Sequence, residues 1–137
     1  MNVEARWDNP EQTILYFRIR DGWTWAELDQ QLDAVEDLTR YLPYDVSAIL
    51  DVQENPTLPG GSLFLPDNLQ HARSLLQRNQ RRHGAVIVVG ADESIRMIFG
   101  CLRLIDSRIG WQVYFTDTLE EARAYLHQQQ EPVQRAC

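Results

Sequence analysis

The stretch "HGAVIVVG" (residues 83–90) indicates the fold class of this chain. It contains an unbroken apolar run between two glycines, without the alternation of a half-exposed strand. Such a run is typical of a strand in the middle of a parallel sheet, where both faces are covered. The stretch therefore predicts an α/β protein built around a parallel sheet.

Four further segments have the pattern of strands: 3–9, 13–20, 45–52 and 111–115. In the second of them, Leu15, Phe17 and Ile19 share one face, while Ile14 and Tyr16 are partly covered on the other. The turn signal "NPE" joins the first two segments, which we expect to pair as an antiparallel hairpin.

Helix signals lie between and after these strands. "TWAE" (24–27) is a capping box, in which Thr24 and Glu27 bond each other's backbone groups. It predicts a helix that runs to about Tyr41, before Pro43, and apolar residues recur along it at helical spacing. This expected buried stripe is Leu28, Leu32, Val35, Leu38 and Leu42. Three later helices are expected to open at 66–68, at Asp92 and at "TLEE" (118–121).

The resulting order is β-β-α-β-α-β-α-β-α. Right-handed crossovers between parallel strands give an open, mostly parallel sheet with one antiparallel edge hairpin and four helices. A chain of 137 residues is long enough for one core. We therefore predict a single domain over residues 1–127 and a flexible C-terminal tail over 128–137.

Composition excludes several classes of function. A net charge of −7 argues against a nucleic-acid partner. The chain contains no lysine, so mechanisms that need a Schiff-base or P-loop lysine are excluded. Neither a signal peptide nor a membrane-length apolar run is present, which predicts a cytoplasmic protein with no integral membrane segment.

Known catalytic patterns are missing from the sequence. There is no GxGxxG, no GxxxxGK[ST] and no GxSxG. His71, His83 and His127 have no partner at metal-ligand spacing, and Cys101 and Cys137 form no metal or disulfide pattern. The sequence predicts no catalytic residue, no metal site and no cofactor, and hence a protein that is not an enzyme.

Two weaker features remain. Asp51 and Glu54 follow a strand at the sheet edge where α/β proteins bind ligands, so they are weak ligand-site candidates and could hold a metal ion. Trp23 and Trp25 flank the helix start. They form either an exposed aromatic contact surface or, as we expect, structural packing against the hairpin and the sheet end.

A long connection, "DVQENPTLPGGSLFLPDNL" (51–69), interrupts the regular pattern. Connections in compact domains usually span about 4–6 residues, and longer ones are commonly functional or disordered. The loop carries apolar residues that either pack as a small satellite core or form an interaction surface. These residues are Leu58, Leu63, Phe64 and Leu65.

The order and spacing of these elements over residues 3–126 resemble the STAS domain of bacterial anti-sigma factor antagonists. The resemblance rests on the opening hairpin, "SAILDV", "GAVIVVG", "ESIRMIF" and "WQVYFTDTLEEARAYL". The chain is also similar to uncharacterised bacterial proteins described as SpoIIAA-like. The resemblance implies a non-enzymatic regulatory or protein-interaction module with contacts through residues 54–65. Its partner would be a kinase-like or sigma-regulatory protein.

The family's phosphorylated serine stands in an Asp-Ser-Ser-Gly turn, which this chain lacks. Thr57 and Ser62 are the hydroxyl residues of the corresponding region, and are therefore the candidates for regulatory phosphorylation. The STAS fold is also similar to that of CRAL-TRIO lipid carriers. This similarity implies an alternative function, a small-ligand or lipid carrier with a pocket at the C-terminal edge of the sheet.

The chain also has features of a homodimer. The predicted first strand, around residues 3–7, is a short and thinly charged edge, and such edges are templates for pairing. The apolar residues of the long loop offer a second patch to bury in a symmetric interface. We therefore expect a homodimer.

Overall fold

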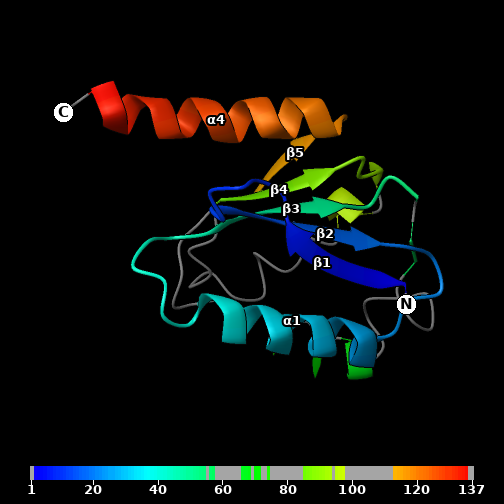
Figure 1. Cartoon of the computed structure of the whole chain (residues 1–137). Coiled ribbons are helices and arrows are strands. Elements are labelled where there is room, and N and C mark those ends of the chain that lie inside the picture. Colours follow the sequence, from blue (N-terminus) through cyan, green and yellow to red (C-terminus); the bar gives the residue numbers. More distant parts are fainter. Residues whose placement is uncertain are drawn as a thin grey trace.

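Five strands form one sheet in the order β1-β2-β3-β4-β5 (Figure 1). The computed structural model describes residues 2–54, 56–57, 66–68, 70–71, 74, 85–93, 95–97 and 113–135, with side chains as far as 128. The strands are β1 (Val3–Trp7), β2 (Ile14–Ile19), β3 (Ser47–Asp51), β4 (Val86–Val89) and β5 (Val113–Thr116). β1 is antiparallel to β2, and the other neighbours are parallel. The predicted α/β class and the edge hairpin are confirmed.

Helices lie on both faces of the sheet. α1 (Trp25–Thr39) and α4 (Leu119–Arg135) cover opposite faces (Figure 1). Residues 66–68, 70, 71 and 74, and residues 93 and 95–97, are also helical, at the places of the second and third predicted helices. α4 continues through Arg135, beyond position 128, where the sequence predicted a tail to begin.

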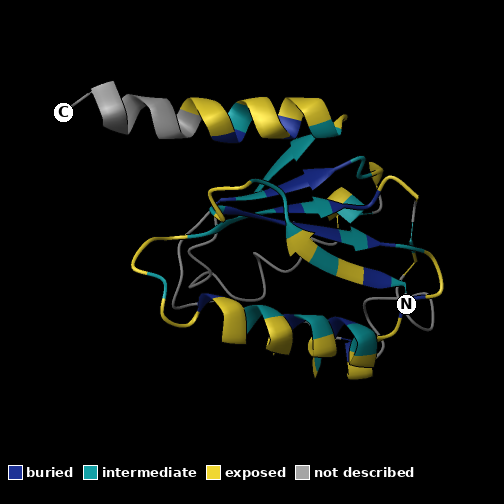
Figure 2. Ribbon diagram, viewed as in Figure 1, coloured by how far each residue is buried: buried dark blue, intermediate teal, exposed yellow. Residues whose placement is uncertain are grey.

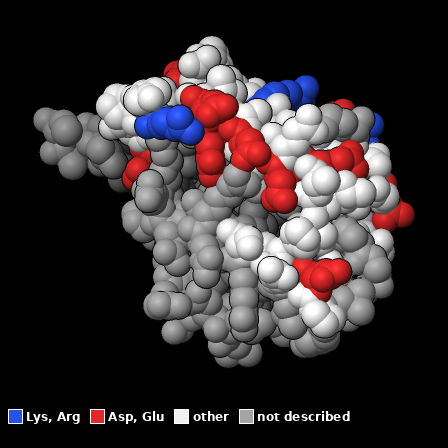
Figure 3. Space-filling model, turned by 90° about the horizontal axis from the view of Figure 1, so that it is seen from below, with Lys and Arg blue, Asp and Glu red and all other residues white. Residues whose placement is uncertain are grey.

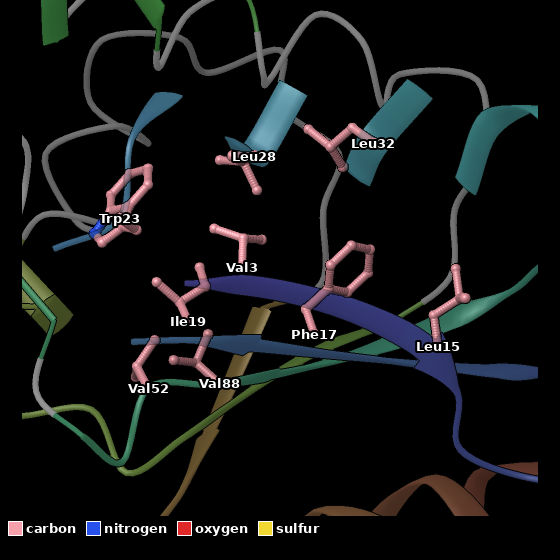
Figure 4. Close-up of a cluster of buried hydrophobic side chains, with 9 residues drawn as sticks. All are labelled: Val3, Leu15, Phe17, Ile19, Trp23, Leu28, Leu32, Val52 and Val88. Carbon is pink, nitrogen blue, oxygen red and sulfur yellow. The ribbon is translucent and has the colours of Figure 1, made fainter. Parts of the chain in front are cut away.

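The larger core cluster lies between the sheet and α1. Leu28 and Leu32 of α1 point toward Val3 of β1 and Phe17 of β2 (Figure 4). Ile95, in the connection between β4 and β5, packs against the same cluster. The described part of this connection therefore lies on the α1 face, as a right-handed crossover requires when β5 is placed beside β4.

The second cluster lies between the sheet and α4. Ile49 and Ile87 are fully buried there, beneath Ala122 and Leu126 of α4. Val88, the neighbour of Ile87, is fully buried on the α1 face. Burial of neighbouring residues on both faces explains the unbroken apolar run of β4. Figure 2 shows the buried strands between the exposed outer surfaces of the two helices.

The predicted helix starts are confirmed in the described residues. Thr24 and Glu27 form the complete capping box at α1. The Asp92 side chain accepts a hydrogen bond from Ile95 N at 2.9 Å, and Thr118 Oγ1 accepts one from Glu121 N at 3.1 Å. The backbone donors of each first turn are thus satisfied by side chains close in sequence.

Two details of the first helix were wrong. α1 ends at Thr39 rather than near Tyr41. Leu38, expected in the buried stripe, is 59% exposed, and Thr39 takes the buried position instead. The Thr39 hydroxyl donates to Val35 O at 2.8 Å, which satisfies its polar group inside the fold.

The hairpin also differs from the prediction in one respect. Ile14 and Tyr16, expected to be only partly covered, are 8% and 6% exposed and belong to the core on the α4 face. Arg123 of α4 donates three hydrogen bonds to Asp8, of 2.6, 2.9 and 3.3 Å, which connect the helix to the end of β1. Ile14 and Tyr16 are therefore buried because α4 packs close to the hairpin.

Candidate functional site

A polar cluster lies where β2 and β3 end. We call it the Tyr16–Asp51 site, and it consists of Tyr16, Arg18, Arg20, Asp51, Gln53 and Glu54. Its position is set by the parallel register of β2 and β3, in which Arg18 stands beside Asp51. Carboxyl ends of neighbouring parallel strands are common ligand-binding positions in α/β sheets.

Strand alternation selects which side chains enter the site. Phe17 and Ile19 point toward α1, so Tyr16 and Arg18 point to the α4 face. Among the described elements, α4 packs mainly against β3, β4 and β5, and α1 packs against β1 on the other face. Charged side chains of the hairpin are consequently solvent-accessible on the α4 face.

Tyr16 and Asp51 form the buried part of the site. Asp51 is 7% exposed, and its Oδ2 accepts a short hydrogen bond from the Tyr16 hydroxyl. Its Oδ1 accepts from Gln53 N at 3.0 Å and from Gln53 Nε2 at 3.1 Å. Three donors thus surround a buried carboxylate, which offsets the cost of removing it from water.

The environment of Tyr16 favours its protonated form. Burial raises the pKa of Tyr16 to about 12, and the hydrogen bond and negative charge of Asp51 act in the same direction. Arg18 and Arg6 oppose this shift, and the Arg6 guanidinium lies 4.9 Å from the centroid of the Tyr16 ring. Tyr16 is therefore a hydrogen-bond donor at neutral pH.

This pKa predicts how stability changes at alkaline pH. The pKa of folded Tyr16 is about 12, above the ordinary value of 10.0, so the protonated phenol stabilises the folded state. That contribution is complete below pH 10 and is lost as the pH rises toward 12. We expect the free energy of unfolding in urea to fall over this interval, and to fall less in Tyr16→Phe. Equal alkaline losses in the two proteins would contradict the assignment.

The exposed part of the site contains ion pairs. Glu54 lies 3.5 Å from Arg18 Nη2 and 3.6 Å from Arg20 Nε, and Arg20 also approaches Glu4 at 3.8 Å. The three side chains at Glu54 are 39–47% exposed. Arg20 Nε is buried and makes no hydrogen bond to any described residue. Pairs between side chains that are exposed to this extent contribute about 0–1 kcal/mol, so another anion can compete for the parts of the two guanidinium groups that solvent reaches.

Thr57 is held beside the site by Asp21. The Asp21 carboxylate accepts hydrogen bonds from Thr57 N at 3.2 Å and from Thr57 Oγ1 at 3.1 Å. These two bonds lower the pKa of Asp21. Thr57, one of the predicted phosphorylation candidates, is exposed. Polar contacts therefore hold the segment after β3 at two points, Glu54 through the arginines and Thr57 through Asp21.

The two predicted ligand-site residues do not act together. Asp51 binds Tyr16 and Gln53, whereas Glu54 faces the two arginines. Within the described ranges there is no group of three or more His, Cys, Asp or Glu side chains that could hold a metal ion. The chemistry available here is recognition of a carboxylate or phosphate by guanidinium groups.

The tryptophans have the structural role that was expected. Trp23 is 8% exposed and contacts the Trp25 ring edge-on, with centroids 4.8 Å apart. Trp25 stacks on His71 at 5.1 Å, and its Nε1 donates to the buried Asn68 side chain at 2.7 Å. The pair thus joins α1 to the helical residues 66–68, 70 and 71.

Several predicted residues lie outside the described part of the chain. They are Leu58, Ser62, Leu63, Phe64 and Leu65 of the long loop, together with His83, Cys101 and Cys137. The surface that these loop residues were expected to form stays a prediction. His127, on α4, is exposed.

Acidic side chains gather on the α1 face of the molecule. Figure 3, viewed from the side of α1, shows acidic side chains gathered on that face. α1 carries Glu27, Asp29, Asp33, Glu36 and Asp37 and no basic residue. Arg6 and Arg18 belong to the opposite face of the sheet. Within the Tyr16–Asp51 site, Arg18 and Arg20 are balanced by Glu54 and Asp51, so the site combines both signs of charge.

Sequence patterns indicated Asp51 and Glu54 as site residues but not Tyr16, Arg18 and Arg20. A signal was present, since "YFRIR" (16–20) places these three residues on one face by strand alternation. Their meeting with Asp51 depended on the β2–β3 register, which the sequence alone does not specify.

Comparisons with known proteins do not identify the chain. No protein-family model matches it, and no curated protein matches it significantly. Among the described residues, no helix has the length and apolar character needed to span a bilayer.

Proposed function

We propose that this chain is a regulatory or protein-interaction module of STAS-like architecture, which binds its partner through the Tyr16–Asp51 site and the 54–65 segment. The observation that carries the proposal is the exposed ion-pair set of Glu54 with Arg18 and Arg20. A partner carboxylate or phosphate can replace Glu54 at the guanidiniums at little cost, because exposed pairs are weak. The partner class is a kinase-like or sigma-regulatory protein.

The fold supports this proposal, although it does not assign the chain to a family. Its mostly parallel sheet with a single antiparallel pair is what the STAS-like order of elements predicts. In that architecture, the segment after β3 leaves the sheet beside the arginines. Release of Glu54 would therefore free the first part of the 54–65 segment to meet the partner.

Phosphorylation of Thr57 would act on the same segment. A phosphate would remove the hydroxyl donor that binds Asp21 and add about −1.5 to −2 charges beside its carboxylate. Repulsion would then detach Thr57 from Asp21, while Arg18 and Arg20 offer nearby cations. Ser62 remains the second candidate of the same region.

A charge-reversal experiment tests the proposal. The Arg18→Glu, Arg20→Glu double variant should lose at least about ten-fold in affinity for partners that wild-type protein captures from its host, since attraction becomes repulsion. Arg40→Glu is the matched control, because Arg40 is exposed at the end of α1 and pairs locally with Asp37 at 3.3 Å. Quantitative mass spectrometry of captured proteins gives the readout.

The expected result is a partner retained by Arg40→Glu and lost by the double variant, with both variants folded by circular dichroism. Equal capture by all three proteins would contradict the proposed binding surface. A lipid or metabolite seen in native mass spectra of freshly purified wild-type protein would instead favour the carrier alternative.

A further inference from the structure

The outer edge of β1 is open in the described structure. Among the described residues, β1 is the first strand of the sheet and pairs only with β2. Asn2 O accepts from Arg20 N, and Asp8 N donates to Ile14 O. By the alternation of an antiparallel ladder, the N–H and C=O groups of Val3, Ala5 and Trp7 then point away from β2. These groups are available to another strand.

The two charged side chains of β1 have opposite signs. Glu4 and Arg6 are exposed and lie on the α4 face. Glu4 makes a long ion pair with Arg20 at 3.8 Å, and Arg6 lies over the Tyr16 ring. They are separated by one residue, Ala5, whose side chain packs with the core on the other face. The edge is therefore self-complementary about Ala5.

We propose that β1 pairs antiparallel with β1 of a second copy, with Ala5 at the two-fold axis. Ala5 then stands opposite the partner's Ala5, and their outward N–H and C=O groups bond each other. Glu4 faces the partner's Arg6, and Arg6 faces the partner's Glu4. These pairs occupy positions without ladder hydrogen bonds, where opposing side chains are closest. Two five-stranded sheets become one continuous sheet.

Charge selects this register over its neighbours. The nearest alternative registers differ by two residues. A shift of one residue would place side chains of opposite faces against each other and would misalign the outward N–H and C=O groups. A shift in one direction places Glu4 opposite the partner's Glu4. A shift in the other places Arg6 opposite the partner's Arg6. Like charges directly opposite each other destabilise a strand pair, whereas opposite charges stabilise it.

The helix beneath the edge fits the same interface. Leu28 and Leu32 point toward Val3 and Phe17, so α1 covers β1 and β2 together (Figure 4). Two such helices across the axis would lie about two strand spacings, or ~10 Å, apart, which matches the usual distance between packed helices. Leu38, 59% exposed, would gain apolar contact there.

Helical spacing supports the placement of Leu38. Glu27 and Leu38 lie on the same side of α1, and Glu27 Oε2 accepts a 2.7 Å hydrogen bond from Asn2 N, just before β1. Trp25, on the other side of the helix, contacts Asn68 and His71. The side that carries Leu38 is therefore the one next to the β1 edge. The interface does not depend on the proposed partner-binding function.

Charge reversal on β1 tests the pairing. By symmetry, Glu4→Arg places two Arg–Arg pairs in the interface, and Arg6→Glu places two Glu–Glu pairs. We expect wild-type protein at twice the chain mass of 16.0 kDa by analytical ultracentrifugation at physiological salt. Each variant alone should raise the dimer dissociation constant at least about ten-fold.

Mixing the two variants supplies the decisive measurement. In a mixed dimer, the arginine of the Glu4→Arg chain would face the glutamate of the Arg6→Glu chain, and the unchanged Arg6 and Glu4 would form the second pair. Both pairs are then attractive, so a tag on one variant should recover the other at near wild-type affinity, which also shows that both chains are folded. A monomeric wild-type protein, or a mixture no tighter than either variant alone, would overturn the proposal.

Discussion

Gly90→Ala should lower the free energy of unfolding by about 3 kcal/mol, through a clash behind the Tyr16–Asp51 site. Gly90 directly follows β4 with a φ of +77°, and an added Cβ would stand 2.9 Å from Gln53 Cα and 2.5 Å from its Cγ. The left-handed backbone costs about 1–2 kcal/mol for an alanine, and the overlap with the Gln53 backbone costs about as much again. Chemical denaturation measures the sum.

Gly22→Ala is the matched control for this substitution. Gly22 has a similar φ of +86°, but its added Cβ would meet only Asn2 Nδ2 at 3.4 Å, an ordinary contact. We expect a loss of about 1 kcal/mol, from the backbone conformation alone. Equal losses for the two variants would show that Gly90 is needed for its conformation and not for the close approach of Gln53.

Asp51→Ala should lower the free energy of unfolding by about 2–4 kcal/mol. The substitution leaves the buried Tyr16 hydroxyl and the Gln53 amide without the acceptor that both now use. The buried Tyr16 hydroxyl costs about 1–3 kcal/mol when it has no partner, and the exposed Gln53 adds at most about 1 kcal/mol, because water can replace the lost acceptor. Asp51→Asn should cost about 1 kcal/mol, because the amide keeps the shape and an oxygen acceptor.

A double substitution distinguishes a coupled network from two separate losses. In Asp51→Ala, Tyr16→Phe, the unsatisfied hydroxyl is absent, so the double variant should be less destabilised than the sum of the single variants. Strict additivity, within about 0.3–0.5 kcal/mol, would contradict the Tyr16–Asp51 contact. The alkaline loss of stability assigned to Tyr16 should also be absent from this variant.

Local sequence was sufficient for the elements and their order. The apolar run at 85–89, the alternation at 14–19 and the capping residues Thr24, Asp92 and Thr118 each predicted an element that the structure contains. These signals act over a few neighbouring residues, through side-chain periodicity and hydrogen bonds to the nearest backbone donors. These signals can therefore be recognised in the sequence without knowledge of the tertiary packing.

Such local signals do not determine which residues of α1 are buried. Leu38 fits the apolar spacing of the helix, yet it is exposed, and Thr39 is buried. The spacing of Leu28, Leu32 and Val35 allows either residue to continue the stripe, since the two positions adjoin on the helix. The direction of α1 across the sheet decided between them.

The site required the tertiary structure. Sequence placed Asp51 and Glu54 at the end of a strand, but Tyr16 lies 35 positions before Asp51, and Thr57 lies 36 positions after Asp21. Those contacts exist because β2 and β3 are neighbours in a parallel register that sets Arg18 beside Asp51. The elements thus follow from interactions between residues a few positions apart, and such interactions can be recognised in the sequence itself. Which strand ends meet is a property of the packed sheet, where burial and register bring distant residues together.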